Sequence, residues 1–86
     1  MEGTLEMWQS VMGFGGWAKK YFILTDSILV CCDKKGGDAE AKVHLKVATI
    51  DPKLEQERQF VLYTGLKELR IRAADGNTKA KWVDAL

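Results

Sequence analysis

The sequence predicts a mainly β fold in which about seven short antiparallel strands are followed by one C-terminal amphipathic helix. Several short segments alternate apolar and polar side chains, which is the period of a half-buried strand. Turns rich in Gly, Asp and Ser separate them, and only the end of the chain changes to helical spacing. The 86 residues, 47% hydrophobic and 29% charged, fit one globular domain with a single core.

Four strands are expected in the first half of the chain: Thr4–Gln9, Trp17–Thr25, Ile28–Asp33 and Lys42–Val47. The first and last alternate apolar and polar residues, and the second is rich in aromatic and β-branched side chains. Between the first two strands, Val11–Gly16 contains three glycines, so we expect a turn or an open loop there.

The second half predicts a short strand within Ala48–Lys53, at an edge because Pro52 cannot donate a ladder hydrogen bond. A hairpin then follows, with strands at Arg58–Thr64 and Lys67–Ala74 on either side of Gly65.

The last segment predicts the helix. Trp82, Ala85 and Leu86 recur at the i, i+3, i+4 spacing of one helix face. Asp75 is the preferred N-cap and Asn77 the alternative.

Composition excludes several classes of function. A net charge of +1 lacks the strongly basic footprint of a nucleic-acid-binding domain. No apolar run approaches the ~20 residues of a membrane-spanning helix, and the start lacks the features of a secretory signal. Two adjacent cysteines form no disulfide framework, so a cytoplasmic location is expected. With one histidine, no nucleophile–base pair and no metal-ligand cluster, we expect neither an enzyme nor a cofactor or metal site.

Four segments, in this order along the chain, resemble landmarks of a pleckstrin homology domain, and the resemblance covers essentially the whole chain. They are Gly3-Thr4-Leu5 with Trp8, Trp17-Ala18-Lys19-Lys20-Tyr21-Phe22-Ile23-Leu24, Leu69-Arg70-Ile71-Arg72-Ala73, and Lys81-Trp82-Val83-Asp84-Ala85-Leu86. Within the family, the opening Met1-Glu2-Gly3 and Trp8 are most similar to the four-phosphate adaptor, oxysterol-binding and ceramide-transfer subgroup.

The resemblance implies a barrel-like fold of two nearly orthogonal antiparallel sheets, capped by the helix with Trp82 as its structural plug. Residues 1–86 are then a single domain, which we expect to have been excised from a longer protein because the chain stops within the helix pattern.

The implied function is non-catalytic membrane recruitment in signalling or lipid transport, through a phosphoinositide headgroup. By resemblance, phosphatidylinositol 4-phosphate is the first candidate lipid and the Golgi the first candidate among intracellular membranes. A protein–protein interaction domain with weak or no lipid specificity is the alternative.

The resemblance also suggests headgroup-binding residues. Lys20 matches the family's basic position before an aromatic-Phe pair, and Lys19 adjoins it; Lys53, Lys34 and Lys35 are further candidates. The alternative is that all of these are solvated lysines. Met7 departs from the subgroup, which has a basic residue at this position.

The glycine-rich segment is the second candidate site. Val11, Met12 and Phe14 give it an apolar character beside Trp17, and the resemblance implies that such a loop inserts into a membrane. Exposed apolar residues clustered at a tip are typical of contact surfaces. The alternative is that Phe14 or Trp17 folds back and closes the end of the barrel.

Overall fold

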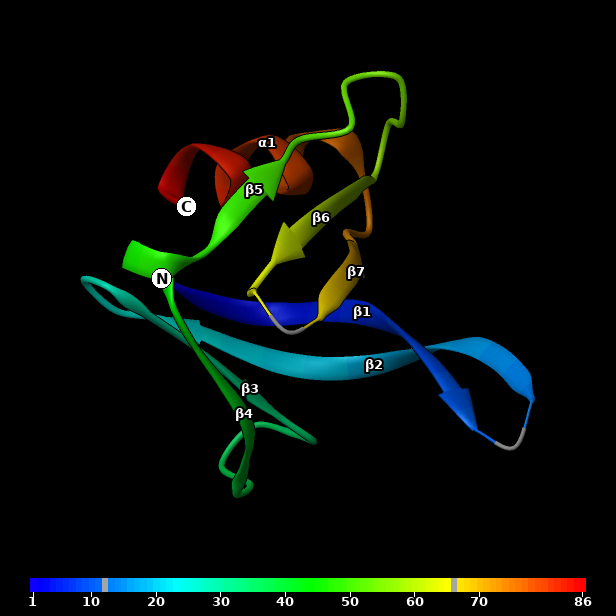
Figure 1. Cartoon of the computed structure of the whole chain (residues 1–86), viewed down its shortest axis with the longest axis vertical. Coiled ribbons are helices and arrows are strands. Elements are labelled where there is room, and N and C mark those ends of the chain that lie inside the picture. The colour runs from blue at the N-terminus through cyan, green and yellow to red at the C-terminus, as the bar shows by residue number, and fades with distance from the viewer. Residues whose placement is uncertain (12, 66) are drawn as a thin grey trace.

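Seven antiparallel strands form one continuous sheet in the computed structural model, which describes residues 1–11, 13–65 and 67–86, without the side chain of Val11 (Figure 1). The elements are β1 (Glu2–Val11), β2 (Phe14–Leu24), β3 (Ile28–Cys32), β4 (Ala39–His44), the 3-10 helix η1 (Leu45–Val47), β5 (Thr49–Asp51), β6 (Gln59–Tyr63), β7 (Glu68–Arg72) and α1 (Gly76–Ala85). The order in the sheet is β4-β3-β2-β1-β7-β6-β5.

Strand β1 joins the two halves of the sheet. It pairs with β2 over its whole length but with β7 only at Glu6 and Met7. The sheet bends there, and β5–β7 cross steeply over β1 and β2 (Figure 1). The predicted mainly β fold with a C-terminal helix is therefore confirmed, and its two expected sheets are continuous through β1.

The core lies between the two halves of the sheet and α1. Its largest fully buried side chains are Phe22, Phe60, Leu62 and Ile71. Trp82 of α1 is 2% exposed and meets Phe22 edge-on, with ring centroids 6.4 Å apart. A large aromatic side chain thus fills the corner that the bent sheet leaves open.

Helix α1 begins as predicted. The Asp75 carboxylate accepts a hydrogen bond from the Thr78 N–H at 2.8 Å, which satisfies a donor of the first turn. Further along, the buried Lys79 ammonium donates to the carbonyl oxygens of Lys53 (2.8 Å) and Gln56. This lysine, which the sequence did not single out, fastens the β5–β6 loop to the helix.

The prediction of a turn or an open loop over Val11–Gly16 is wrong for most of that segment. Val11 pairs with Phe14, and Ser10 with Gly15, so the strands continue almost to the tip of the hairpin. Gly13 has a φ of 86°, the left-handed conformation that tight hairpin turns require. Met12 lies outside the described residues.

The prediction of a strand over Lys42–Val47 is only half right. The strand ends at His44, opposite Ile28, because β3 begins at Ile28 and offers no further partner. The Leu45 N–H bonds to the Ser27 carbonyl at 2.9 Å, and the chain then turns through η1. Val47, whose alternation indicated a core-facing side chain, is 77% exposed.

Candidate functional site

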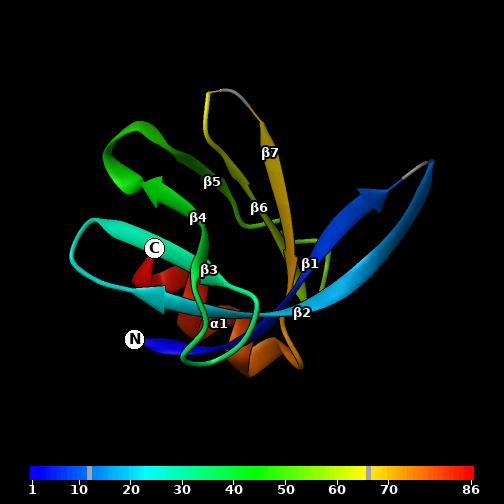
Figure 2. The ribbon, with the colours of Figure 1, turned by 90° about the horizontal axis from the view of Figure 1, so that it is seen from below.

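The β1–β2 hairpin extends beyond the rest of the sheet as a two-stranded arm, residues 8–11 and 14–17. Pairing of β1 with β7 stops at Met7, so these residues pair only with each other. The arm projects from the body in both views (Figures 1 and 2). Because an isolated hairpin is at best marginally stable in water, side chains must support the arm.

A stack of side chains on one face supplies this support. Trp8 and Trp17 are cross-strand neighbours in edge-to-face contact, with ring centroids 5.4 Å apart. The Arg72 guanidinium lies 4.4 Å from the Trp17 ring centroid, a cation–π contact. The arm is thereby joined to β7 of the body.

Glu6 fixes the arginine in place. Arg72 donates two hydrogen bonds to the Glu6 carboxylate, from Nε at 3.2 Å and from Nη2 at 2.9 Å. These bonds hold the pKa of Glu6 below its usual value. Two parallel bonds fix the guanidinium plane as well as its position, so Trp17 meets a fixed cation.

Gly15 makes room for the Trp8 ring. A Cβ atom on Gly15 would lie 2.2 Å from Trp8 Cζ2, whereas one on the neighbouring Gly16 would meet open space. The two glycines therefore have different roles, although both lie in β2.

The tip of the arm presents an aromatic side chain to solvent. Phe14 is 82% exposed, so it does not fold back into the core. Strand alternation places it on the face of the arm opposite Trp17. Trp17 is half-buried under Arg72 and lies back from the tip. Of the other two residues predicted to insert, the side chain of Val11 and all of Met12 lie outside the described structure.

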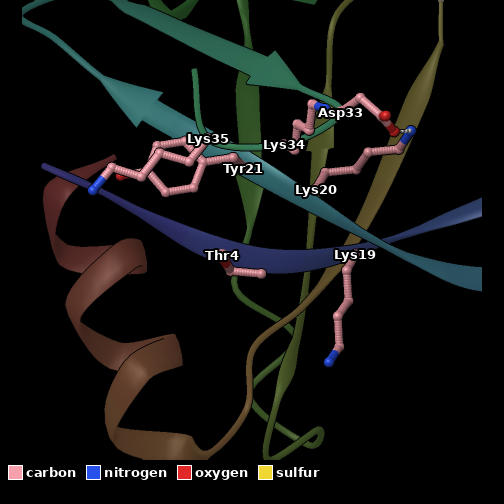
Figure 3. Close-up of a pocket in the computed structure, with 7 residues that line it drawn as sticks. All are labelled: Thr4, Lys19, Lys20, Tyr21, Asp33, Lys34 and Lys35. Atoms are coloured by element: carbon pink, nitrogen blue, oxygen red, sulfur yellow. Dashed lines mark hydrogen bonds and ion pairs between the residues drawn. The ribbon is translucent and has the colours of Figure 1, made fainter. Parts of the chain in front are cut away.

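A shallow cavity of about 260 Å³ lies where β1 and β2 face the β3–β4 loop (Figure 3). Its lining residues are Thr4, Lys19, Lys20, Tyr21, Asp33, Lys34 and Lys35. Four of the five candidate headgroup-binding lysines therefore line one cavity, although they come from β2 and from a loop more than ten residues further along the chain. Their side chains diverge, and Lys19 points away from Lys34 and Lys35 (Figure 3).

Three of these lysines present their charge to solvent, where an anion could bind. Lys19, Lys34 and Lys35 are exposed and form no ion pair within the described part of the chain. Lys34 and Lys35 sit in a turn closed by the Gly37 N–H on the Lys34 carbonyl at 2.9 Å. This lysine triad gives a nearly neutral domain a local positive surface.

Lys20 is buried and paired with carboxylates, unlike an exposed lysine that is free to bind a phosphate. It is 7% exposed, because it shares the inward face of β2 with Phe22. Its ammonium lies 2.9 Å from a Glu40 oxygen and 3.3 Å from an Asp33 oxygen. The hydrogen bond to Glu40, then the one to Asp33, raise its pKa against the opposing effect of burial. Its charge is therefore already neutralised by the protein.

The position of these two carboxylates gives Lys20 a structural role. Asp33 is the first residue of the β3–β4 loop and Glu40 lies near the start of β4, so one ammonium joins both ends of the loop to β2. The loop that carries Lys34 and Lys35 is thus held beside Lys19. No local sequence pattern indicated this carboxylate pair, since Asp33 and Glu40 resemble ordinary surface acids.

Met7 and Lys53 do not contribute to the cavity lining. Met7 packs against the core on the same face of β1 as Leu5. Lys53 lies in the β5–β6 loop, where its ammonium is 3.3 Å from an Asp51 oxygen. That loop and the β3–β4 loop lie at opposite ends of the molecule (Figure 1).

The described residues contain no group of three or more His, Cys, Asp and Glu side chains placed to hold a metal ion. Among the same residues, no helix is long and apolar enough to cross a membrane.

Comparison with known proteins gives consistent matches. A family model described as PH domain matches residues 1–86. Oxysterol-binding protein-related protein 1C of Arabidopsis thaliana is 36% identical over 45 residues, which are 52% of this chain and 6% of that protein. The chain thus corresponds to a small part of that relative's length.

Solved structures share the fold. The PH domain of human oxysterol-binding protein-related protein 11 is 20% identical, with a TM-score of 0.79 over 98% of this chain and 73% of that one. The C-terminal PH domain of pleckstrin, in complex with an inositol pentakisphosphate, is 21% identical, with a TM-score of 0.81 over 99% of this chain and 90% of that one.

Proposed function

Because this chain belongs to the PH domain family, we propose that it is a non-catalytic module that recruits a larger protein to phosphoinositide-bearing membranes. The headgroup binds at the lysine triad Lys19, Lys34 and Lys35, and Phe14 enters the membrane from the tip of the arm. Lys20 acts by holding the β3–β4 loop, and Lys53 has no part in the site.

The lysine triad is the observation that carries this proposal. Phosphate groups are bound by charge-assisted donors, and three lysines that have no ion-pair partner among the described residues line one cavity. Each basic residue near an anionic leaflet contributes ~1 kcal/mol to the free energy of membrane binding. The triad therefore supplies attraction that the net charge of +1 does not.

The arm adds an apolar contact. Phe14 lies five residues before Lys19 in β2, which is about 16 Å along an extended strand. Trp8 and Trp17 lie between them, and such amphipathic rings favour the boundary between headgroups and acyl chains. One orientation therefore allows lysines at the headgroups, tryptophans at the interface and Phe14 below them.

Phosphatidylinositol 4-phosphate is the first lipid to test, and the cytoplasmic face of the Golgi the first membrane. The resemblance to the oxysterol-binding subgroup suggests both. The inositol pentakisphosphate bound to the similar pleckstrin domain supports inositol phosphates as the ligand class.

A titration of the ¹⁵N-labelled chain with the soluble headgroup of phosphatidylinositol 4-phosphate tests the site. We expect amide shifts at β2 and in the β3–β4 loop. Lys34→Ala and Lys35→Ala should each weaken binding about tenfold or more, since a hydrogen bond to a charged group contributes ~1.5–3 kcal/mol. Lys46→Ala is the matched control, because this exposed lysine lies outside the cavity. An equal loss in the control would contradict the assigned site.

A protein-interaction domain is the second candidate function, and two observations favour it. Lys20 is already paired, and Met7 faces the core where the subgroup has a basic residue. This function predicts no preference for phosphoinositide vesicles over other anionic vesicles.

A further inference from the structure

The free edge of β4 opens into a cavity of about 470 Å³. Its lining residues are Glu40, Ala41, Lys42, Val43 and His44 of β4, Val47 of η1, and Thr64, Lys67 and Leu69 of the β6–β7 hairpin. These residues define the β4 groove. Its volume lies within the ~300–1,000 Å³ range of protein ligand pockets.

The wall formed by β4 consists of five consecutive residues. Neighbouring side chains in a strand point to opposite faces, so a groove beside one face would be lined by every second residue. A continuous run means that the groove follows the edge of the strand. Because β4 is the last strand of the sheet, its outer backbone N–H and C=O groups have no neighbouring strand in the described part of the chain (Figure 1).

An unprotected edge of this kind is a template for another extended chain. The exposed side chain of Val47 and the partly buried side chain of Leu69 offer apolar contacts to such a strand. Natural sheets usually cover or shorten their edges, whereas β4 has six residues and the groove beside it is open.

The charged residues of the groove indicate which kind of peptide it binds. Lys42 of β4 and Lys67 of the β6–β7 hairpin are exposed and have no ion-pair partner within the described residues. The one carboxylate of the groove, on Glu40, is paired with Lys20. A second copy of this chain would bring the same two lysines against the first pair, so like charges oppose pairing of two β4 edges.

We propose that the β4 groove binds an extended acidic peptide of a partner protein, which adds as a further strand to β4 while its carboxylates meet Lys42 and Lys67. This site is separate from the lysine triad, since the two share no lining residue. The domain then contacts a membrane and a protein at the same time.

The test uses the ¹⁵N-labelled whole chain and two blocked pentapeptides, Val-Glu-Val-Glu-Val and Val-Lys-Val-Lys-Val. We expect the acidic peptide to shift the amide signals of Ala39–His44, and the basic peptide to bind at least tenfold more weakly. An acidic peptide with N-methylated backbone amides should also bind at least tenfold more weakly, because it cannot complete the strand ladder. Equal binding of the methylated peptide would overturn strand addition.

Charge reversal supplies the variants. Lys42→Glu combined with Lys67→Glu should lower affinity for the acidic peptide at least tenfold and favour the basic one. Lys46→Glu reverses one charge outside the groove, and its affinity for the acidic peptide should stay within twofold of that of the wild type. No shift at millimolar acidic peptide, equal binding of both peptides, or a dimer of the free chain in sedimentation equilibrium would overturn the proposal.

Discussion

Gly15→Ala tests whether the stack of Glu6, Arg72, Trp17 and Trp8 holds the arm to the body. A methyl group on Gly15 would lie 2.2 Å from Trp8 Cζ2, which is closer than any van der Waals contact allows. Because the nearest atoms belong to one ring, the ring moves and its edge contact with Trp17 is lost.

The expected magnitude follows from the contacts. An aromatic edge pair is worth ~0.5–1.5 kcal/mol, and the cation–π contact of Arg72 with Trp17 ~0.5–1 kcal/mol if Trp17 also moves. Gly16→Ala is the matched control, since its methyl group meets open space. The alanine also lowers the entropy of the unfolded chain, which should stabilise the folded domain by ~0.4–1 kcal/mol. A difference of 1 kcal/mol corresponds to ~4–8 °C in melting temperature for a domain of this size.

Thermal melting and tryptophan fluorescence provide the assay. Gly15→Ala should melt several degrees below Gly16→Ala, and its emission should shift because Trp8 leaves its packed position. It should also bind phosphoinositide vesicles more weakly while keeping its affinity for the soluble headgroup. Identical melting and emission for the two variants would refute the supporting role of the stack.

Three further predictions concern the body of the domain. Lys20→Met should lower the melting temperature, because Asp33 and Glu40 lose their shared partner. It should also weaken headgroup binding, because the β3–β4 loop is no longer held; unchanged amide exchange in that loop would contradict this. Trp82→Ala should destabilise the domain by ~3–5 kcal/mol in urea unfolding, whereas a loss below ~1 kcal/mol would show that another group fills the corner. Arg72 lowers the pKa of Glu6 in the folded protein, so ionised Glu6 stabilises the fold. This stabilisation is complete above the unfolded pKa of ~4.3 and is lost as pH falls through the folded pKa. Glu6→Gln should therefore flatten the dependence of the melting temperature on acid pH.

The order and type of most elements followed from local signals in the sequence. Alternation, turn residues and the Asp75 cap act within a few residues, and these predicted the β6–β7 hairpin and the helix. The strand ends depended on partners instead. Alternation continues through Leu45 and Val47, yet β4 stops where β3 has no residue left to pair.

The sequence allowed candidate lysines to be named, but not their arrangement in space. Of the five candidates, Lys19, Lys20, Lys34 and Lys35 line one cavity, whereas Lys53 lies outside it. Lys20 shares its face of β2 with buried Phe22, a signal of inward orientation that strand period contains. Its neutralisation by Glu40, twenty residues away, depends on the β3–β4 register, which no local pattern encodes.

The arm shows the same limit. Three glycines and apolar residues indicated an exposed loop, and Phe14 is exposed, but the backbone is a paired hairpin. The stack depends on Arg72 reaching Trp17 across the sheet, from a strand 55 residues further along the chain. Only the β1–β7 pairing brings them together.

Vesicle sedimentation tests the central claim most directly. The wild-type chain and Phe14→Ser are compared on vesicles containing phosphatidylinositol 4-phosphate and on phosphatidylserine vesicles of matched charge, with soluble-headgroup affinity measured in parallel. The wild type should sediment with the phosphoinositide vesicles in preference. Phe14→Ser should bind them about tenfold or more weakly, since burying a Phe side chain is worth ~1.5–3 kcal/mol, at unchanged melting temperature and soluble-headgroup affinity. Equal sedimentation of the wild type on both vesicle types, or full binding by Phe14→Ser, would contradict recruitment by headgroup recognition and insertion of the arm.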